Sequence, residues 1–181
     1  MKKNLFCLFL YLLSIISASA ENAEEIVLAS GSSVTDILID SNDNHTVLFW
    51  TGIFAEDIER VSGQKPAVRH NPEEVSENCI IIGSIEESGI IRDLVRRKLL
   101  DVSEIRGKWE ASVTQIIENP YKNVKKALVI AGSDRRGTVY AALDISRQAG
   151  VSPWYWFADV HPVKKEEIRI SMERKAESTD P

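Results

Sequence analysis

Three observations in the sequence predict an α/β domain of the α+β type, in which about three helices pack on a mixed sheet. Strand-like segments alternate with three helical patterns, and one further strand has a period of two. About 160 residues remain after an N-terminal export signal. That length can bury a core, but it falls well short of the roughly 250 residues of a (β/α)8 barrel. We therefore expect one domain over 21–172 and a polar tail over 173–181.

The first twenty residues predict a cleavable secretion signal. Residues 1–3 carry two lysines, residues 5–16 form a largely apolar run, and residues 17–20 end in an Ala-x-Ala exit. The apolar run is too short to cross a bilayer comfortably, so this segment is not expected to be an anchor. We expect cleavage after Ala20 and a secreted or periplasmic product.

The remaining composition excludes several classes of partner. Without the signal the chain has 20 basic and 27 acidic side chains, a net charge of about −7, so neither nucleic acid nor a membrane surface is expected. Cys79 lies in an apolar run and is expected to be a buried small hydrophobe without a disulfide. The three histidines are too scattered for a metal site, and no cofactor motif is present.

The first half of the chain predicts several strands and one long helix. Apolar residues recur at helical spacing from Val47 to Val61, and Gly63 ends that helix. The residues 31–33 have the composition of a turn between the first two strands. The last of the strands is apolar enough to be covered on both faces. The strand-like segments are 24–28, 37–39, 65–69 and 78–83.

The second half predicts two more helices. The first has apolar positions at 91, 94, 95 and 99, with its basic residues toward water. Residues 109–118 alternate between apolar and polar, which is typical of a half-exposed antiparallel strand, and Asn119-Pro120 ends it. A short strand is expected at 167–170.

The clearest unit is a buried strand over 126–131 followed by a turn and a helix. Ser133 or Asp134 can cap that helix, which runs to Gln148, and Gly150 supplies its C-terminal glycine. The inward face of this helix is expected to contain Val139, Ala142, Leu143 and Ala149.

The turn before this helix contains the first candidate binding residues. Glycines flank the segment 132–138, but the lysine of a phosphate loop is absent. Asp134 is expected to cap the helix, while Arg135 and Arg136 project from its first turn, where cations oppose the helix dipole. They should therefore pair with carboxylates of a neighbouring domain, with an acidic ligand, or with Asp134 or Asp159 of this chain.

The aromatic string Trp-Tyr-Trp-Phe at 154–157 supplies the second set of candidates. In an extended segment alternate rings face opposite sides, so one pair can enter the core and the other can meet a partner surface or a sugar ring. Trp154, Trp156 and the following Asp159 are accordingly interface or binding candidates, and packing of all the rings in the core is the alternative. We assign no catalytic residue, because the paired acids of the sequence lie in polar loops or on helix surfaces and no nucleophile motif is present.

Three stretches resemble the N-terminal domain of glycoside hydrolase family 115, the large α-glucuronidases that act on glucuronoxylan side chains. The stretches are 131–140, 144–146 and 150–160, and residues 107–110 and 119–120 fit the same pattern. Phe157 stands where the family commonly has another Trp, and His161-Pro162 resembles a one-residue insertion. The resemblance implies that a (β/α)8 catalytic barrel follows this domain and carries the catalytic carboxylates, which are then absent from this chain.

Three hypotheses follow. The leading one is a non-catalytic N-terminal accessory module of a secreted family 115 α-glucuronidase, with the missing barrel as its partner. The candidate residues would then face the barrel, near the carboxylate of a glucuronic acid. The second is a free-standing module that binds a carbohydrate or an acidic ligand, and the third and least favoured is a small complete hydrolase.

Overall fold

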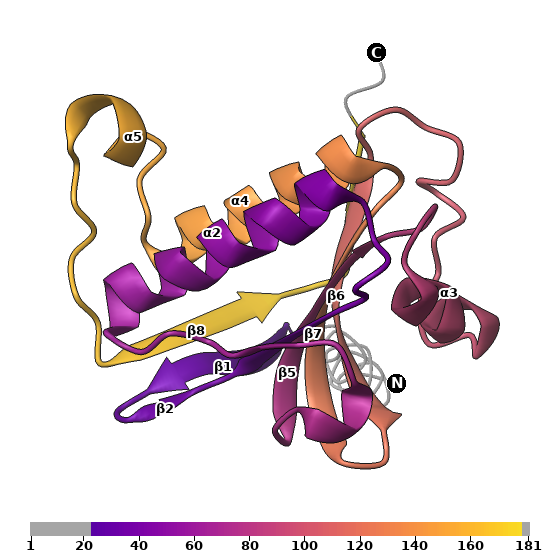
Figure 1. The fold of residues 1–181 in the computed structure, drawn as a ribbon, viewed down its shortest axis with the longest axis horizontal. Coiled ribbons are helices and arrows are strands. Elements are labelled where there is room, and N and C mark those ends of the chain that lie inside the picture. Colours follow the sequence, from indigo (N-terminus) through magenta and orange to yellow (C-terminus); the bar gives the residue numbers. More distant parts are fainter. Residues whose placement is uncertain (1–22, 179–181) are drawn as a thin grey trace, which may run out of the picture.

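The computed structural model describes residues 23–178, in which α2 and α4 lie side by side across two sheets (Figure 1). The secretion signal expected over residues 1–20 lies outside the described residues. The α-helices within this range are α2 (His45–Ser62), α3 (Gly89–Arg96), α4 (Arg135–Ala149) and the single turn α5 (Tyr155–Ala158). A mixed α/β fold was predicted, and the structure confirms it.

The larger sheet has six strands and is mixed in direction. In the order β4-β3-β5-β7-β6-β9, the first four strands are parallel, while β6 runs antiparallel to both β7 and β9. Its strands are β3 (Asp36–Ile39), β4 (Val68–Arg69), β5 (Asn78–Ser84), β6 (Ser112–Tyr121), β7 (Val124–Gly132) and β9 (Lys175–Glu177). Strand β9 falls within the range 173–181 that was expected to be a polar tail.

A second, antiparallel sheet contains β1 (Glu24–Ser30), β2 (Ser33–Val34) and β8 (Glu167–Met172), in the order β2-β1-β8. The predicted turn at 31–33 therefore joins β1 to β2, and not to the strand at 36–39, which lies in the larger sheet. The reason is burial: Ile37, Leu38 and Ile39 are fully buried and need apolar cover on both faces. The larger sheet provides it, because Ile37 and Ile39 join the core on one of its faces and Leu38 joins the core on the other.

Alternate residues of the central strands feed two core clusters on opposite faces of the larger sheet. Ile80 and Ile82 pack under α2 and α4 together with the smaller sheet, while Cys79 and Ile81 pack against α3 and the loop that follows it. Burial, ahead of the nearby charge of Asp36, raises the pKa of the Cys79 thiol to about 12. The prediction of a buried small hydrophobe is thus confirmed.

The two C-terminal helix ends form as the sequence predicts. Gly63 ends α2 with a φ of 80°, and Gly150 ends α4 with a φ of 121°. Asn44, which the sequence analysis did not assign, caps the start of α2 and accepts a hydrogen bond from the backbone N–H of Thr46 at 3.0 Å.

Strand β6 differs from its prediction in two respects. It begins at Ser112 and not at Trp109, and it passes Asn119 through a bulge to end at Tyr121. It is also not half-exposed, because Ser112 and Thr114 are each 6% exposed. Their small hydroxyl side chains lie on the face that α4 covers, so a polar residue type did not mean exposure to water.

Candidate functional site

Two hollows lie along α4, one at its N-terminal end and the other beside the helix from Tyr140 onward, and the predicted binding and interface residues are divided between them. The strand-end hollow, with a volume of about 470 Å³, is lined by residues 134–136. The helix pocket, with a volume of about 650 Å³, is lined by Trp156. Since α4 has 15 residues, about 22 Å separates its ends. The predicted residues therefore do not form one site, and Trp154 and Asp159 line neither hollow.

The strand-end hollow lies beyond the carboxyl ends of β5 and β7, the edge at which open α/β sheets bind ligands. Two glycines allow the chain to turn closely there. A Cβ atom on Gly132 would lie 2.1 Å from the backbone nitrogen of Thr138, and one on Gly137 would lie 2.2 Å from the carbonyl oxygen of Ala111. Backbone packing alone thus accounts for the glycines that suggested a phosphate loop.

Asp134 is the helix cap, and it also holds the neighbouring loop in place. Its Oδ1 accepts hydrogen bonds from the backbone N–H groups of Arg136 and Gly137, both at 2.8 Å. Its Oδ2 accepts a third from the backbone N–H of Glu110 at 2.9 Å. Both carboxylate oxygens are therefore committed to the backbone of this domain.

The two arginines of the turn differ in their contacts. Nη1 of Arg136 pairs with Glu110 at 2.9 Å, and Nη2 donates to the hydroxyl of Tyr140 at 2.9 Å. The hydrogen bond with Tyr140, ahead of the charge of Glu110, raises the pKa of Arg136. Arg135 is exposed and forms no ion pair with any residue of 23–178. The partner of Arg136 within the chain is thus Glu110, and neither Asp134 nor Asp159.

The opposite wall of the strand-end hollow contains acids that sequence analysis did not single out. Asp43 precedes the lining residue Asn44 but does not line the hollow itself. It is 5% exposed and accepts hydrogen bonds from the backbone and the hydroxyl of Ser84, at 2.9 and 2.7 Å. Burial raises the pKa of Asp43 in spite of these bonds. Asn44 donates to Glu87 at 2.9 Å. The ionisable side chains that line the hollow are Glu86, Glu87, Lys108, Asp134, Arg135 and Arg136. With three acids and three bases, the hollow selects neither anions nor cations by charge alone.

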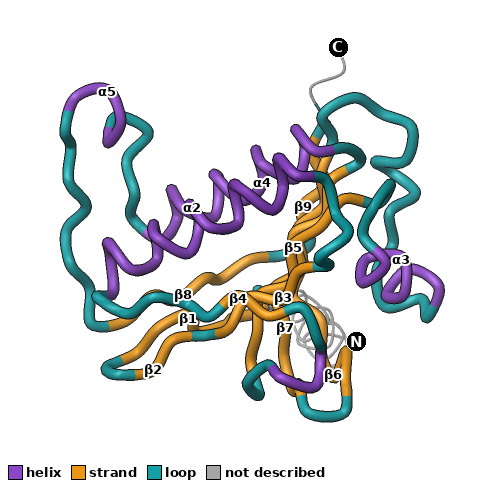
Figure 2. The backbone as a smooth tube through the Cα atoms, viewed as in Figure 1, coloured by secondary structure: helices purple, strands orange, loops and turns teal. Residues whose placement is uncertain are grey.

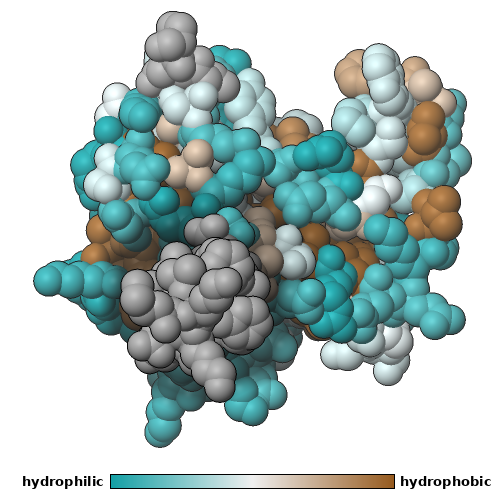
Figure 3. Space-filling view, turned by 180° about the vertical axis from the view of Figure 1, so that it is seen from behind, coloured by the Kyte–Doolittle hydropathy of each residue, from teal (hydrophilic) through white to brown (hydrophobic). Residues whose placement is uncertain are grey.

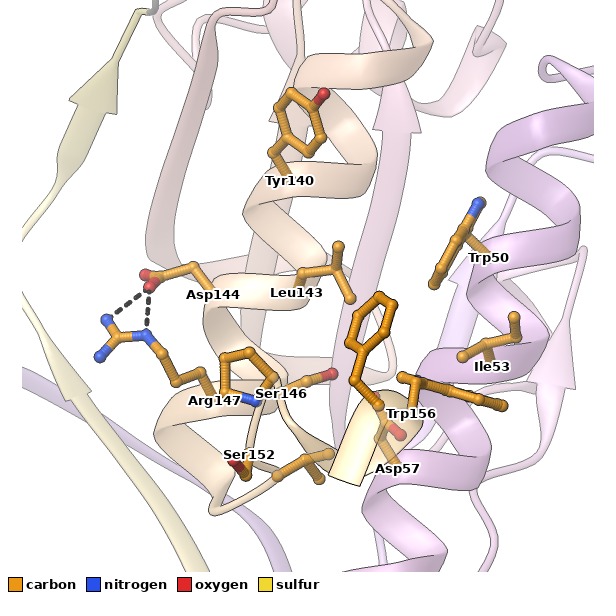
Figure 4. Close-up of a pocket in the computed structure, with 13 residues that line it drawn as sticks. Trp50, Ile53, Asp57, Tyr140, Leu143, Asp144, Ser146, Arg147, Ser152 and Trp156 are labelled. Carbon is orange, nitrogen blue, oxygen red and sulfur yellow. Dashed lines mark hydrogen bonds and ion pairs between the residues drawn. The ribbon is translucent and has the colours of Figure 1, made fainter. Parts of the chain in front are cut away.

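The helix pocket lies between α2 and α4, beside α5 (Figure 4). Trp50 and Ile53 of α2 and Leu143 of α4 point into the same space. Asp144 and Arg147 of α4, which form an ion pair at 2.7 Å, also line the pocket. Leu143 was predicted to face the core, but it is 38% exposed because the apolar face of α4 continues into this open pocket.

Two polar side chains lie at the buried end of the helix pocket. Asp57 is 2% exposed and Ser146 is 3% exposed. Asp57 pairs with Arg60 at 2.8 Å, but burial is the larger effect, so the pKa of Asp57 is raised. A buried acid seven residues from Trp50 on the apolar face of α2 was the signal in the sequence that could have located this pocket.

Arg60 connects α2 to the aromatic string. Its guanidinium lies 4.8 Å from the ring centroid of Tyr155 and 5.5 Å from that of Trp156. The same group binds Asp57 and Glu56. Loop segments lead to and from α5 at its outlying position, so these contacts from Arg60 help to fix the rings (Figure 2).

The aromatic string is helical, and the prediction of an extended segment with alternating rings was wrong. Trp154 precedes the single turn of α5, and its carbonyl accepts the backbone N–H of Ala158 at 2.8 Å. Trp154, Trp156 and Phe157 are 64%, 57% and 85% exposed, while Tyr155 alone packs against the core. Seen from behind, the lobe that carries α5 stands apart and shows apolar surface (Figure 3).

A solved structure shows to which protein family the chain is related. The chain matches a structure described as a novel family GH115 4-O-methyl-α-glucuronidase with specificity for decorated arabinogalactans. The two are 33% identical over 84% of this chain, with a TM-score of 0.68. The chain is related to glycoside hydrolase family 115. It spans 18% of the length of that GH115 enzyme.

The resemblance to family 115 and the mixed fold predicted from the sequence are therefore confirmed. No family model matches the chain, and neither does any curated protein. Within residues 23–178, no cluster of three or more histidine, cysteine or acidic side chains is arranged to hold a metal ion. The helices of the same region are too short or too polar to cross a membrane.

Proposed function

We propose that this chain is an accessory N-terminal module of an exported family 115 α-glucuronidase, and that it packs on the catalytic barrel and helps to shape its cleft. The observation that carries this proposal is the exposed aromatic surface of α5. Trp156 and Phe157 expose more than half of their area, and complete burial of one such ring is worth about 1.5–3 kcal/mol. An apolar patch of this kind marks an interaction surface.

The relationship to family 115 supports a domain of the same enzyme as the covering partner. The matched region is 18% of the GH115 chain, so most of that enzyme consists of other domains. A covering domain would bury the rings of α5 and the helix pocket beside it.

The positions of the buried acids support a non-catalytic role. Glycoside hydrolysis uses two carboxyl groups roughly 5–9.5 Å apart. Asp43 precedes α2 and Asp57 lies in its fourth turn, so roughly 20 Å of helix separates them. Each is also engaged by its own partners, Ser84 and Arg60 respectively.

The substrate we propose is a polysaccharide with 4-O-methylglucuronic acid side groups. Glucuronoxylan is the substrate that the family resemblance implies. The matched GH115 enzyme is described as specific for decorated arabinogalactans, so the uronic acid is the shared feature. Secretion or export to the periplasm, which the N-terminal signal predicts, completes the proposal because such polymers are extracellular.

A chimera tests the accessory role. Residues 21–178 of this chain would replace the matched region of the GH115 4-O-methyl-α-glucuronidase, and release of 4-O-methylglucuronic acid would be measured. We expect turnover by the chimera, no turnover by this chain alone, and loss of soluble enzyme when the matched region is deleted. A soluble but inactive chimera, or turnover by the isolated chain, would refute the proposal.

A free-standing binding module is the second candidate, because Arg135 is exposed and unpaired among the described residues at the mouth of the strand-end hollow. An arginine fork can grip a carboxylate in bidentate fashion. Calorimetry with glucuronic acid would separate the candidates. Saturable binding by the isolated chain that Arg135→Ala abolishes would favour the binding module.

A further inference from the structure

The helix pocket has a polar group without a partner at its buried end. The Ser146 hydroxyl is buried, and no atom of the described chain is in hydrogen-bonding geometry with it. The hydroxyl lies near the carboxyl group of Asp57. Its presence lowers the pKa of Asp57, but burial, which is the larger effect, raises that pKa. Buried hydroxyl groups in folded proteins almost always have a hydrogen-bond partner. We therefore expect a group from outside the described chain to enter the pocket and bond to this hydroxyl.

The walls of the pocket define the body of that group. Trp50, Trp156 and Phe157 present aromatic surface, and Ile53 and Leu143 add aliphatic surface between them. A volume of about 650 Å³ accommodates a large side chain with part of its backbone. Aromatic rings pack well against such walls through edge and offset contacts.

The buried end defines the tip of the group. The ionised Asp57 carboxylate can only accept hydrogen bonds, and one of its oxygens is already bound to Arg60. The Ser146 hydroxyl, which has no partner in the described chain, can accept a hydrogen bond as well. A ligand that reaches this end should therefore carry a donor. A free sugar fits poorly, since most of its hydroxyl groups would face the apolar side chains of Trp50, Leu143 and Trp156.

We propose that the helix pocket receives one aromatic side chain with a hydrogen-bond donor at its tip, contributed by the remainder of the family 115 enzyme. This inference rests on the proposed accessory function and deepens it. The side chain would enter between α2 and α4, pack on Trp50 and Trp156, and donate its hydrogen bond to Ser146.

A matched pair of probes tests the pocket on the isolated chain, without the catalytic domain. Chain labelled with 5-fluorotryptophan would be titrated by ¹⁹F NMR with p-cresol, which carries a donor, and with toluene, which lacks it. The resonances of Trp50 and Trp156 should shift, while that of Trp109, in the strand-end hollow, should not. We expect p-cresol to bind at least about five-fold more tightly than toluene, as one hydrogen bond provides.

Two serine variants provide the control. Ser146→Ala should remove the preference for p-cresol, whereas Ser152→Ala, at the rim of the same pocket, should retain it. Equal binding of the two probes, or a shift at Trp109 alone, would overturn the inference. So would sedimentation showing that p-cresol dissociates a dimer, because the occupant would then be a second copy of this chain.

The chimera identifies the source of the side chain and separates the two proposals. Leu143→Glu places a charge in the pocket and should lower the activity of the chimera at least ten-fold. Phe49→Glu changes an equally apolar residue of α2 that is 59% exposed and does not line the pocket, and it should have little effect. An inactive parent chimera would refute the accessory function. If the parent chimera is active and the Leu143→Glu substitution does not lower its activity, only the inference about the helix pocket is refuted.

Discussion

Replacement of Asp134 by alanine should destabilise the domain by about 2–3 kcal/mol, because one carboxylate accepts three backbone hydrogen bonds. Loss of a helix cap costs typically about 1 kcal/mol. The bond from the backbone N–H of Glu110, at 2.9 Å, adds about 1–2 kcal/mol because its acceptor is charged. In a domain of this size each kcal/mol lowers Tm by about 2–4 °C, so we expect a fall of about 5–10 °C.

The Asp134→Asn variant separates the two contributions. Its amide oxygen can still cap α4, but the amide nitrogen cannot accept a hydrogen bond from the backbone of Glu110. We expect Asp134→Asn to lose about half as much stability as Asp134→Ala, measured by circular dichroism during thermal and urea unfolding. Equal losses in the two variants would show that the helix cap contributes nothing and would contradict the assigned geometry. An unchanged Tm in Asp134→Ala would refute the structural role of the residue altogether.

Four other outcomes are expected. Arg135→Ala should leave Tm nearly unchanged, whereas Arg136→Ala should lower it slightly, since only the second arginine has partners in the described chain; the opposite order would exclude this geometry. The ¹³C titration midpoint of Asp57 should lie above the ordinary 3.8, so that its contribution to stability falls as pH rises through the raised pKa; Asp57→Asn should lack this component. In a chain without residues 1–20, and so without Cys7, Cys79 has a pKa of about 12 and should react with a thiol reagent at pH 8 only after unfolding; rapid reaction of that native chain would contradict its burial. N-terminal sequencing of the exported product should begin directly after Ala20, and an intact N-terminus would rule out the cleavable signal.

The elements predicted best from the sequence are those fixed by local chemistry. The strand over 126–131 is an unbroken apolar run, and Asp134 and Gly150 cap the helix that follows it through contacts within a few residues. Periodicity and capping therefore suffice for such a unit.

The wrong predictions concern contacts between distant segments. Ser112 and Thr114 suggested an exposed face, but α4, some twenty residues later, covers them. The rings at 154–157 suggested a strand, but Arg60, nearly a hundred residues earlier, packs over two of them in a helical turn. No local pattern carries this information, because it arises only when the helices pack together.

The helix pocket was not predicted for the same reason. Trp50 and Asp57 lie on α2, and Ser146 lies on α4, so the pocket exists only where the two helices meet. The acid on the apolar face of α2 was the one local sign of it.

The residues of the stretches that resemble family 115 divide into two groups with different physical roles. One group has structural roles within this domain and contains Gly132, Asp134 and Gly137. The glycines allow close contact between backbone segments, and the aspartate accepts hydrogen bonds from three backbone N–H groups. Trp156 and Phe157 contribute little to this domain, since most of their surface meets solvent. Free energy from burying them becomes available only when another surface covers α5. A change such as Phe157→Ser should therefore leave the stability of the isolated chain within about 0.5 kcal/mol, yet weaken assembly of the chimera. A large loss of stability in the isolated chain would mean that the ring serves this domain and not a partner.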